Sequence, residues 1–150
     1  MKAILVSLLM VTSSGAALAQ ADASCLFKPA ELAAALGQTP DTVVAKTDPS
    51  GTSCSYRVGK SPAFSARVVA KCDQARFDSH AKLMQSTSGK PNNPLAGIGD
   101  GAYFSPGGTA AARVGGRCIQ LSGLRAGARR EVTADDAAKL LGLAVTRVGN

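Results

Sequence analysis

The sequence has few of the residues that most metal, cofactor and nucleic-acid sites require. Its 150 residues include one histidine and no tryptophan, and its aromatic residues are two tyrosines and four phenylalanines. A lone histidine excludes a histidine metal cluster, and scarce aromatic side chains leave little with which to stack nucleic-acid bases. We therefore expect no metal, no cofactor and no nucleic-acid partner.

The cysteines do not have the spacing of redox or zinc motifs. Cys25, Cys54, Cys72 and Cys118 lie too far apart for a C-x-x-C pair. An even number of cysteines in an exported chain predicts structural disulfides. Four cysteines allow three pairings, and we favour Cys25 with Cys54, which ties the first helix to a hairpin, and Cys72 with Cys118.

The chain also lacks an apolar run long enough for a permanent transmembrane helix. It opens with Met1-Lys2, a short apolar run from Ile4 to Val11, and the small-x-small pattern Ala17-Leu18-Ala19 that signal peptidase recognises. We therefore predict that residues 1–19 are a secretory signal cleaved before Gln20. Residues 20–150 would then form one periplasmic or secreted domain without a transmembrane segment.

Along this domain, segments whose apolar residues recur with the period of a helix alternate with segments that have the period of a strand. Apolar side chains lie at every second position on both sides of the turn Gly59-Lys60-Ser61-Pro62. This pattern predicts a hairpin, with Cys54 and Cys72 on its apolar face. The predicted helices are 29–37, 73–85 and 133–142, and the predicted strands are 42–45, 53–58, 64–72, 110–114 and 117–124. Residues 143–148 fit a terminal strand or a tail. This order predicts an α+β domain with an antiparallel sheet of about five strands, three flanking helices and two disulfides.

One cysteine does not fit the alternation. On the strand 117–124, Ile119 and Leu121 share a face, and Cys118 lies on the opposite face. Either the Gly115-Gly116 pair introduces a bulge that turns the cysteine round, or the sheet is covered on both faces.

The stretch GIGDGAYFSPGG at 97–108 invites a phosphate-loop reading. A phosphate loop needs a lysine or a following helix, but Ala102-Tyr103-Phe104 follows, which favours a strand. We interpret Gly97 to Gly101 as a backbone turn into this strand, and Pro106-Gly107-Gly108 as the turn that leaves it. Asp100 stands alone among the glycines.

Charge gives the most distinctive pattern. Without Lys2, the chain keeps 16 basic and 10 acidic residues, and no acid lies between Asp100 and Glu131. This segment carries Arg113 and the four residues that we expect to bind a partner, Arg117, Arg125, Arg129 and Arg130. Their guanidinium groups suit carboxylates and phosphates. We expect an anion-binding or partner-binding surface here, although a solvated edge that resists strand pairing fits the same pattern.

The expected function is therefore a non-enzymatic binding domain whose partner is an unknown protein or an anionic envelope polymer. A first alternative is an inhibitor of an envelope hydrolase, in which a mobile loop at 86–94 would enter the enzyme's cleft. A second is a small hydrolase that uses Asp100 with His80, which requires the two side chains to lie close together in a pocket.

Three short motifs support a resemblance. They are Cys25 before Glu31-Leu-Ala-Ala-Ala-Leu-Gly37, then Cys54-Ser55-Tyr56, and Gly97-Ile98-Gly99-Asp100-Gly101-Ala102-Tyr103. Together they resemble a family of small exported proteins of unknown function, which is similar to extracellular sensor-like domains and lipoproteins of actinobacteria. The resemblance implies a helix-flanked antiparallel sheet with disulfides, and it brings no catalytic residues.

Overall fold

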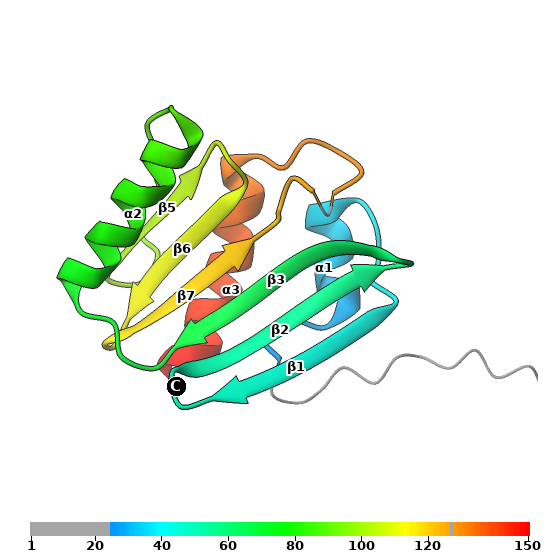
Figure 1. Cartoon of the computed structure of the whole chain (residues 1–150), viewed down its shortest axis with the longest axis horizontal. Helices are drawn as coiled ribbons and strands as arrows, with labels where there is room; N and C mark the ends of the chain where they lie inside the picture. The colour runs from blue at the N-terminus through cyan, green and yellow to red at the C-terminus, as the bar shows by residue number, and fades with distance from the viewer. Residues whose placement is uncertain (1–24, 127) are drawn as a thin grey trace, which may run out of the picture.

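The computed structural model describes residues 25–126 and 128–150, so the predicted signal at 1–19 lies outside the described residues. Within them the chain forms three helices, α1 (Pro29–Leu36), α2 (Gln74–Ser88) and α3 (Ala134–Gly149). The strands are β1 (Thr42–Asp48), β2 (Gly51–Val58), β3 (Ser61–Val69), β4 (Asn93–Pro94), β5 (Gly101–Ser105), β6 (Thr109–Val114) and β7 (Arg117–Ser122). They form one sheet in the order β1-β2-β3-β7-β6-β5-β4, and every neighbouring pair is antiparallel (Figure 1).

The predicted α+β class, the three helices, the antiparallel sheet and the two disulfides are confirmed. The sheet has seven strands in the described residues rather than about five. Part of the difference is β4, a two-residue strand that pairs with β5 at Tyr103 and Phe104. A strand this short carries no periodic pattern, so periodicity could not predict it.

The helix starts follow from capping residues. Asp73 precedes α2 and accepts a hydrogen bond from the backbone N–H of Arg76 at 2.8 Å. Thr133 and Asp136 form a capping box at the start of α3. Gly37 closes α1 in the left-handed conformation that favours glycine, with φ of 70°. These residues lie at the predicted starts of the second and third helices and at the predicted end of the first.

Two predicted helix ends are wrong. The second helix runs on to Ser88, so only part of the segment 86–94 is a loop, and the third helix continues past Gly142 to Gly149. Residues 143–148 are therefore helical, not a strand or a tail. The apolar stripe of α3 continues through Ala144, which is fully buried, and this packing outweighs the roughly 1 kcal/mol cost of an interior glycine.

The main core lies between the sheet and the layer formed by α1 and α3 (Figure 1). Tyr56 of β2 is fully buried there, and its hydroxyl donates to the backbone carbonyl of Phe27 at 3.1 Å and accepts from the Phe27 N–H at 3.0 Å. Burial raises the pKa of Tyr56 to about 12. The Cys25–Cys54 disulfide joins the same two segments, which fixes the chain before α1 on the sheet.

A second, smaller core lies on the other face, under α2. Phe77 packs there with Tyr103, Ala111 and Cys118. Of the two explanations for the orientation of Cys118, coverage of both sheet faces is therefore correct. Cys72 lies beyond the end of β3 in this second core and is bonded to Cys118. The expectation that Cys72 shares a face with Cys54 is wrong, because the strand alternation stops at Val69.

The α2 side of the sheet is only half covered. The helix packs on β5 and β6, and β1, β2 and β3 have no described helix above them on this side (Figure 1). We call the outward-pointing residues of β1–β3, together with the end of β7, the open face. None of the helices in residues 25–126 and 128–150 is both long and apolar enough to cross a membrane.

Candidate functional site

The arginines of the predicted surface are divided between the two ends of the strand β7. Arg117 begins β7, and Arg125, Arg129 and Arg130 all follow the opposite end of that strand. Arg117 donates to the carbonyl of Val148 near the end of α3, at 3.0 Å. The four arginines therefore do not form one cluster.

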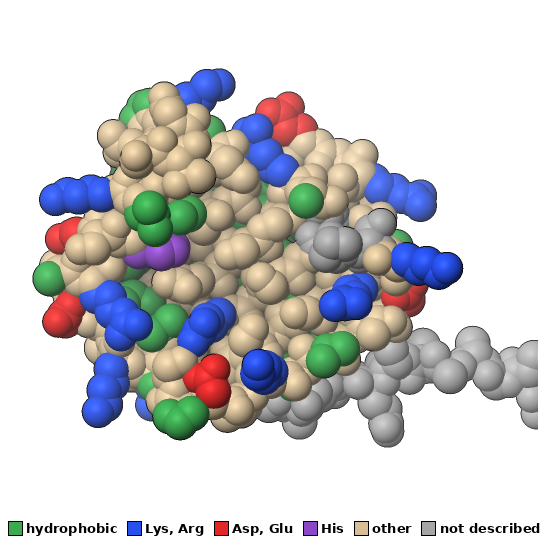
Figure 2. All heavy atoms as spheres, in the orientation of Figure 1, with side chains coloured by type: hydrophobic (Ala, Val, Ile, Leu, Met, Phe, Trp, Pro, Cys, Tyr) green, Lys and Arg blue, Asp and Glu red, His purple; other side chains and the backbone are tan. Residues whose placement is uncertain are grey.

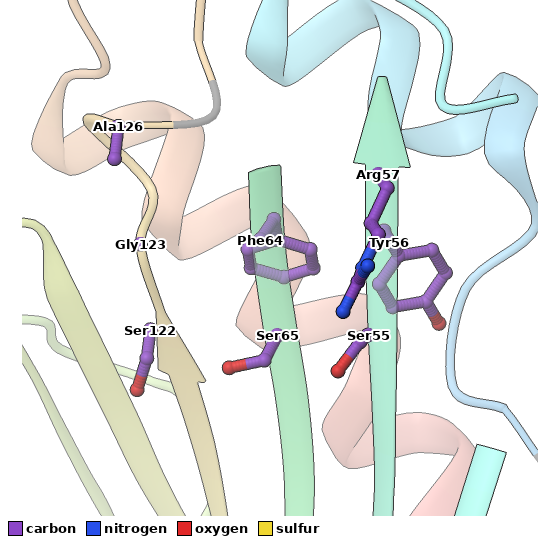
Figure 3. Close-up of a pocket in the computed structure, with 8 residues that line it drawn as sticks. All are labelled: Ser55, Tyr56, Arg57, Phe64, Ser65, Ser122, Gly123 and Ala126. Atoms are coloured by element: carbon purple, nitrogen blue, oxygen red, sulfur yellow. The ribbon is translucent and has the colours of Figure 1, made fainter. Parts of the chain in front are cut away.

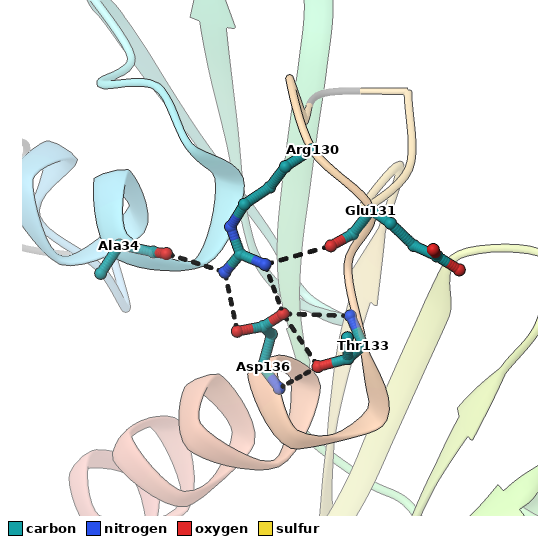
Figure 4. A network of polar contacts seen from close by, with 5 residues as sticks. All are labelled: Ala34, Arg130, Glu131, Thr133 and Asp136. Carbon is teal, nitrogen blue, oxygen red and sulfur yellow. Dashed lines mark hydrogen bonds and ion pairs between the residues drawn. The ribbon is translucent and has the colours of Figure 1, made fainter.

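Arg130 holds two helices together (Figure 4). Its guanidinium donates to both carboxylate oxygens of Asp136, at 2.8 and 2.9 Å, and to the carbonyl of Ala34 in α1 at 2.9 Å. Asp136 is 8% exposed and also accepts from the backbone and side chain of Thr133. The hydrogen bonds from Arg130, reinforced by Thr133, hold the pKa of Asp136 well below its usual range. Arg130 is therefore engaged in structural bonds.

The other two arginines of this loop have different surroundings. A side chain added at Gly108 would meet Arg125, so Arg125 packs against the turn between β5 and β6. The backbone N–H of Arg129 donates to the carbonyl of Leu36 at the end of α1. Both residues are exposed.

His80 and Asp100 bond to different partners. The Nδ1 atom of His80 lies 2.5 Å from the hydroxyl of Tyr103, between α2 and the sheet, and burial lowers the pKa of His80. Asp100 accepts from the backbone N–H of Gly115 at 3.1 Å and lies 3.6 Å from Arg113. The glycine-rich stretch is therefore bonded to the β6–β7 turn, and the carboxylate of Asp100 makes these bonds.

The open face carries a pocket that the sequence analysis did not single out (Figure 3). Ser55, Ser65 and Ser122 lie directly opposite one another on β2, β3 and β7. They form the serine row, in which the three hydroxyl side chains lie side by side. With Arg57, they line a pocket of about 320 Å³, which we call the serine pocket, together with Tyr56, Phe64, Gly123 and Ala126.

Arg57 differs from Arg117 and Arg130 of the predicted surface in having no bonded group. Its exposed side chain has no hydrogen-bond or ion-pair partner in the described part of the chain. In Figure 3 the guanidinium extends along β2 toward Ser55. A free guanidinium beside three hydroxyl groups supplies several hydrogen-bond donors for one anion.

The charge around the pocket is mostly positive. Lys46 and Arg67 also point outward on the open face, and Asp48 is the acid that pairs with Arg67, at 3.9 Å. The Nε atom of Arg67 is buried without a hydrogen-bond partner among the described residues. In Figure 2, blue basic side chains stand around a tan area in the middle of this face.

The aromatic residues contribute no stacking surface. Phe27, Tyr56, Phe64, Phe77, Tyr103 and Phe104 are each at most 7% exposed. The polar groups that this face offers a ligand are therefore hydroxyl, guanidinium and ammonium groups, and the exposed side chain of Val44 lies beside Ser55.

The serines gave only a weak signal in the sequence. Ser55 and Ser65 occupy the outward positions of alternating strands, where a serine is usual, and only the strand register aligns them with Ser122.

In the described part of the chain, no group of three or more His, Cys, Asp or Glu residues could hold a metal ion. Comparisons with protein-family models, with curated proteins and with solved structures each found no match to this chain.

Proposed function

We propose that this chain is a non-enzymatic binding domain that holds an anionic ligand in the serine pocket of its open face. The observation that carries the proposal is the unpartnered side chain of Arg57 beside the serine row. An arginine forms charge-assisted hydrogen bonds with a carboxylate or a phosphate, and the row adds neutral donors at the same place. We place the site here rather than on the segment of Arg117 to Arg130, because Arg117 and Arg130 are bonded to other groups of the chain. The exposed residues Arg125 and Arg129 do not line this pocket.

We also infer that the domain works in the periplasm or after secretion. Two disulfides and no free cysteine in the described residues suit an oxidising compartment. The anionic groups of an envelope polymer are ligands available there.

A matched pair of small sugars tests the binding proposal. Galacturonate and galactose are similar sugars, of which only galacturonate carries a carboxylate. In a titration followed by the amide NMR signals, galacturonate should shift the signals of Ser55, Ser65 and Ser122, and galactose should shift them far less. The effect should weaken with added salt, because exposed charges are screened.

Substitution identifies the charge responsible. Arg57→Ala should weaken galacturonate binding by about tenfold, the loss expected for one charge-assisted hydrogen bond. Lys139→Ala is the matched control, because Lys139 is exposed on α3 behind the sheet and the charge change is the same. Equal losses in both variants, or no response to galacturonate, would remove the serine pocket as an anion site.

A further inference from the structure

A second pocket lies at the other end of β7. Its volume is about 560 Å³, and it is lined by Lys71, Cys72, Asp73, Gln74, Arg76, Arg113 and Gly116. These residues come from the start of α2, the segment before it and the β6–β7 hairpin. Because three of them are basic, we call this cavity the basic pocket.

The cations of the basic pocket are only partly neutralised. The carboxylate of Asp73 is engaged in capping α2. Arg113 lies 3.6 Å from Asp100, but its Nε atom is buried without a partner among the described residues. The side chain of Lys71 is exposed and pairs with no acid among the described residues. The pocket therefore keeps an excess of positive charge.

The two pockets lie at opposite ends of one strand, on the same side of the sheet. Gly116 lines the basic pocket and Ser122 lines the serine pocket. At about 3.3 Å per residue, the six residue steps from Gly116 to Ser122 span roughly 20 Å. Arg67 of β3 lies between the two ends, opposite Gln120 of β7. Cations are therefore present at both ends of this path, and Arg67, which is paired with Asp48, lies in the middle.

We propose that the ligand of the open face is a linear acidic glycan that lies along β3 and β7, with acid groups in both pockets. This inference rests on the proposed function and adds the length and the class of the ligand. Guanidinium and ammonium groups match the acid groups, and the serine row matches sugar hydroxyls, which both donate and accept hydrogen bonds. Every aromatic side chain is buried, so the face lacks the stacking platform that single-stranded nucleic acid uses.

The test compares a short and a long oligosaccharide made of the same acidic sugar. A galacturonate disaccharide is too short to span the roughly 20 Å along β7 between Gly116 and Ser122, and a longer oligogalacturonate reaches both pockets. Calorimetry should show the longer chain binding about tenfold or more tightly than the disaccharide, because two linked contacts add avidity. Equal affinity for the two lengths would overturn the inference.

Variants separate this inference from the proposed function. Lys71→Ala, at an exposed position, should lower the affinity for the longer chain and leave the affinity of the disaccharide for the serine pocket, followed by the amide signals of Ser55, Ser65 and Ser122, unchanged. Arg113→Ala is a second variant, with circular dichroism to check its folding. If Arg57→Ala weakens both sugars and Lys71→Ala and Arg113→Ala weaken neither, the proposed function stands and the polymer inference falls. If neither sugar binds, both fail.

A separate binding experiment tests whether the polymer is a glycan rather than another linear anion. Inorganic polyphosphate and a single-stranded oligonucleotide of matched charge are the competing linear anions. The glycan assignment expects each to bind more weakly than the oligogalacturonate at the same ionic strength. Binding of either at equal or higher affinity would overturn the assignment to a glycan.

Discussion

At the residue scale, two glycines of the loop before β5 form a matched pair. Gly97 and Gly99 both have positive φ, of 74° and 57°. A side chain added at Gly97 meets nothing within 4 Å, but a Cβ at Gly99 would lie 2.3 Å from the carbonyl oxygen of Arg113. The next residue, Asp100, donates its N–H to that same oxygen. The loop is therefore in close contact with the β6–β7 hairpin at Gly99 and not at Gly97.

This difference makes a stability prediction. Gly97→Ala should cost about 1–2 kcal/mol in the free energy of unfolding, the cost of a left-handed conformation for a residue with a Cβ. Gly99→Ala has the same backbone cost and must also move the hairpin, so it should cost at least about 3 kcal/mol. Urea unfolding of the two variants measures both. Equal costs would mean that the contact with Arg113 has no consequence.

At the element scale, the helix starts and the strand alternation were predictable because each depends on neighbouring residues. Asp73 and Thr133 bond within their own first turn, which a sequence displays directly. The orientation of Cys118 left two explanations open, because whether α2 covers the second face is a tertiary question. Gly142 suggested a helix end, but the packing of α3 against the sheet extends the helix.

The candidate site was less predictable than the elements. The spacing of the arginines along the chain placed Arg117 with Arg125 and Arg130, but β7 separates the first from the others. The bonds of Arg130 to Asp136 and Ala34 depend on how α1 and α3 approach each other. Likewise, the serine row exists only once the register of β2, β3 and β7 is known. Side chains that meet across the fold leave no local pattern.

The attachment of α2 to the sheet gives a pH prediction. Burial lowers the pKa of His80, so the unfolded chain binds its proton at a higher pH than the folded chain does. The contribution of this residue to stability should be complete above about pH 6.5 and should fall as the pH decreases below that value. Because the chain has one histidine, His80→Gln isolates the effect. Urea unfolding of both proteins at about pH 7.5 and pH 5 measures how much the free energy of unfolding falls between the two pH values. An equal fall in the original protein and in His80→Gln would contradict the prediction.

At the scale of the whole molecule, each disulfide holds a different layer on the sheet. Cys25–Cys54 fixes the segment before α1 on one face, and Cys72–Cys118 fixes the start of α2 on the other. The second bridge lies at the basic pocket, which Cys72 lines. The position of α2, and with it the basic side chains at its start, therefore depends on that bridge.

Removing each disulfide separately tests whether each one holds a different layer on the sheet. The bridges close loops of 29 and 46 residues, and loop entropy predicts that replacing either pair by alanines costs about 3–4 kcal/mol. Their equilibrium costs should be similar, but the local effects should differ. Without Cys72–Cys118, amide hydrogen exchange should quicken mainly in α2, because the small second core then holds that helix without a covalent link. Without Cys25–Cys54, the faster exchange should lie around α1. Faster exchange spread evenly over the chain in both variants would show that the layers do not separate in this way.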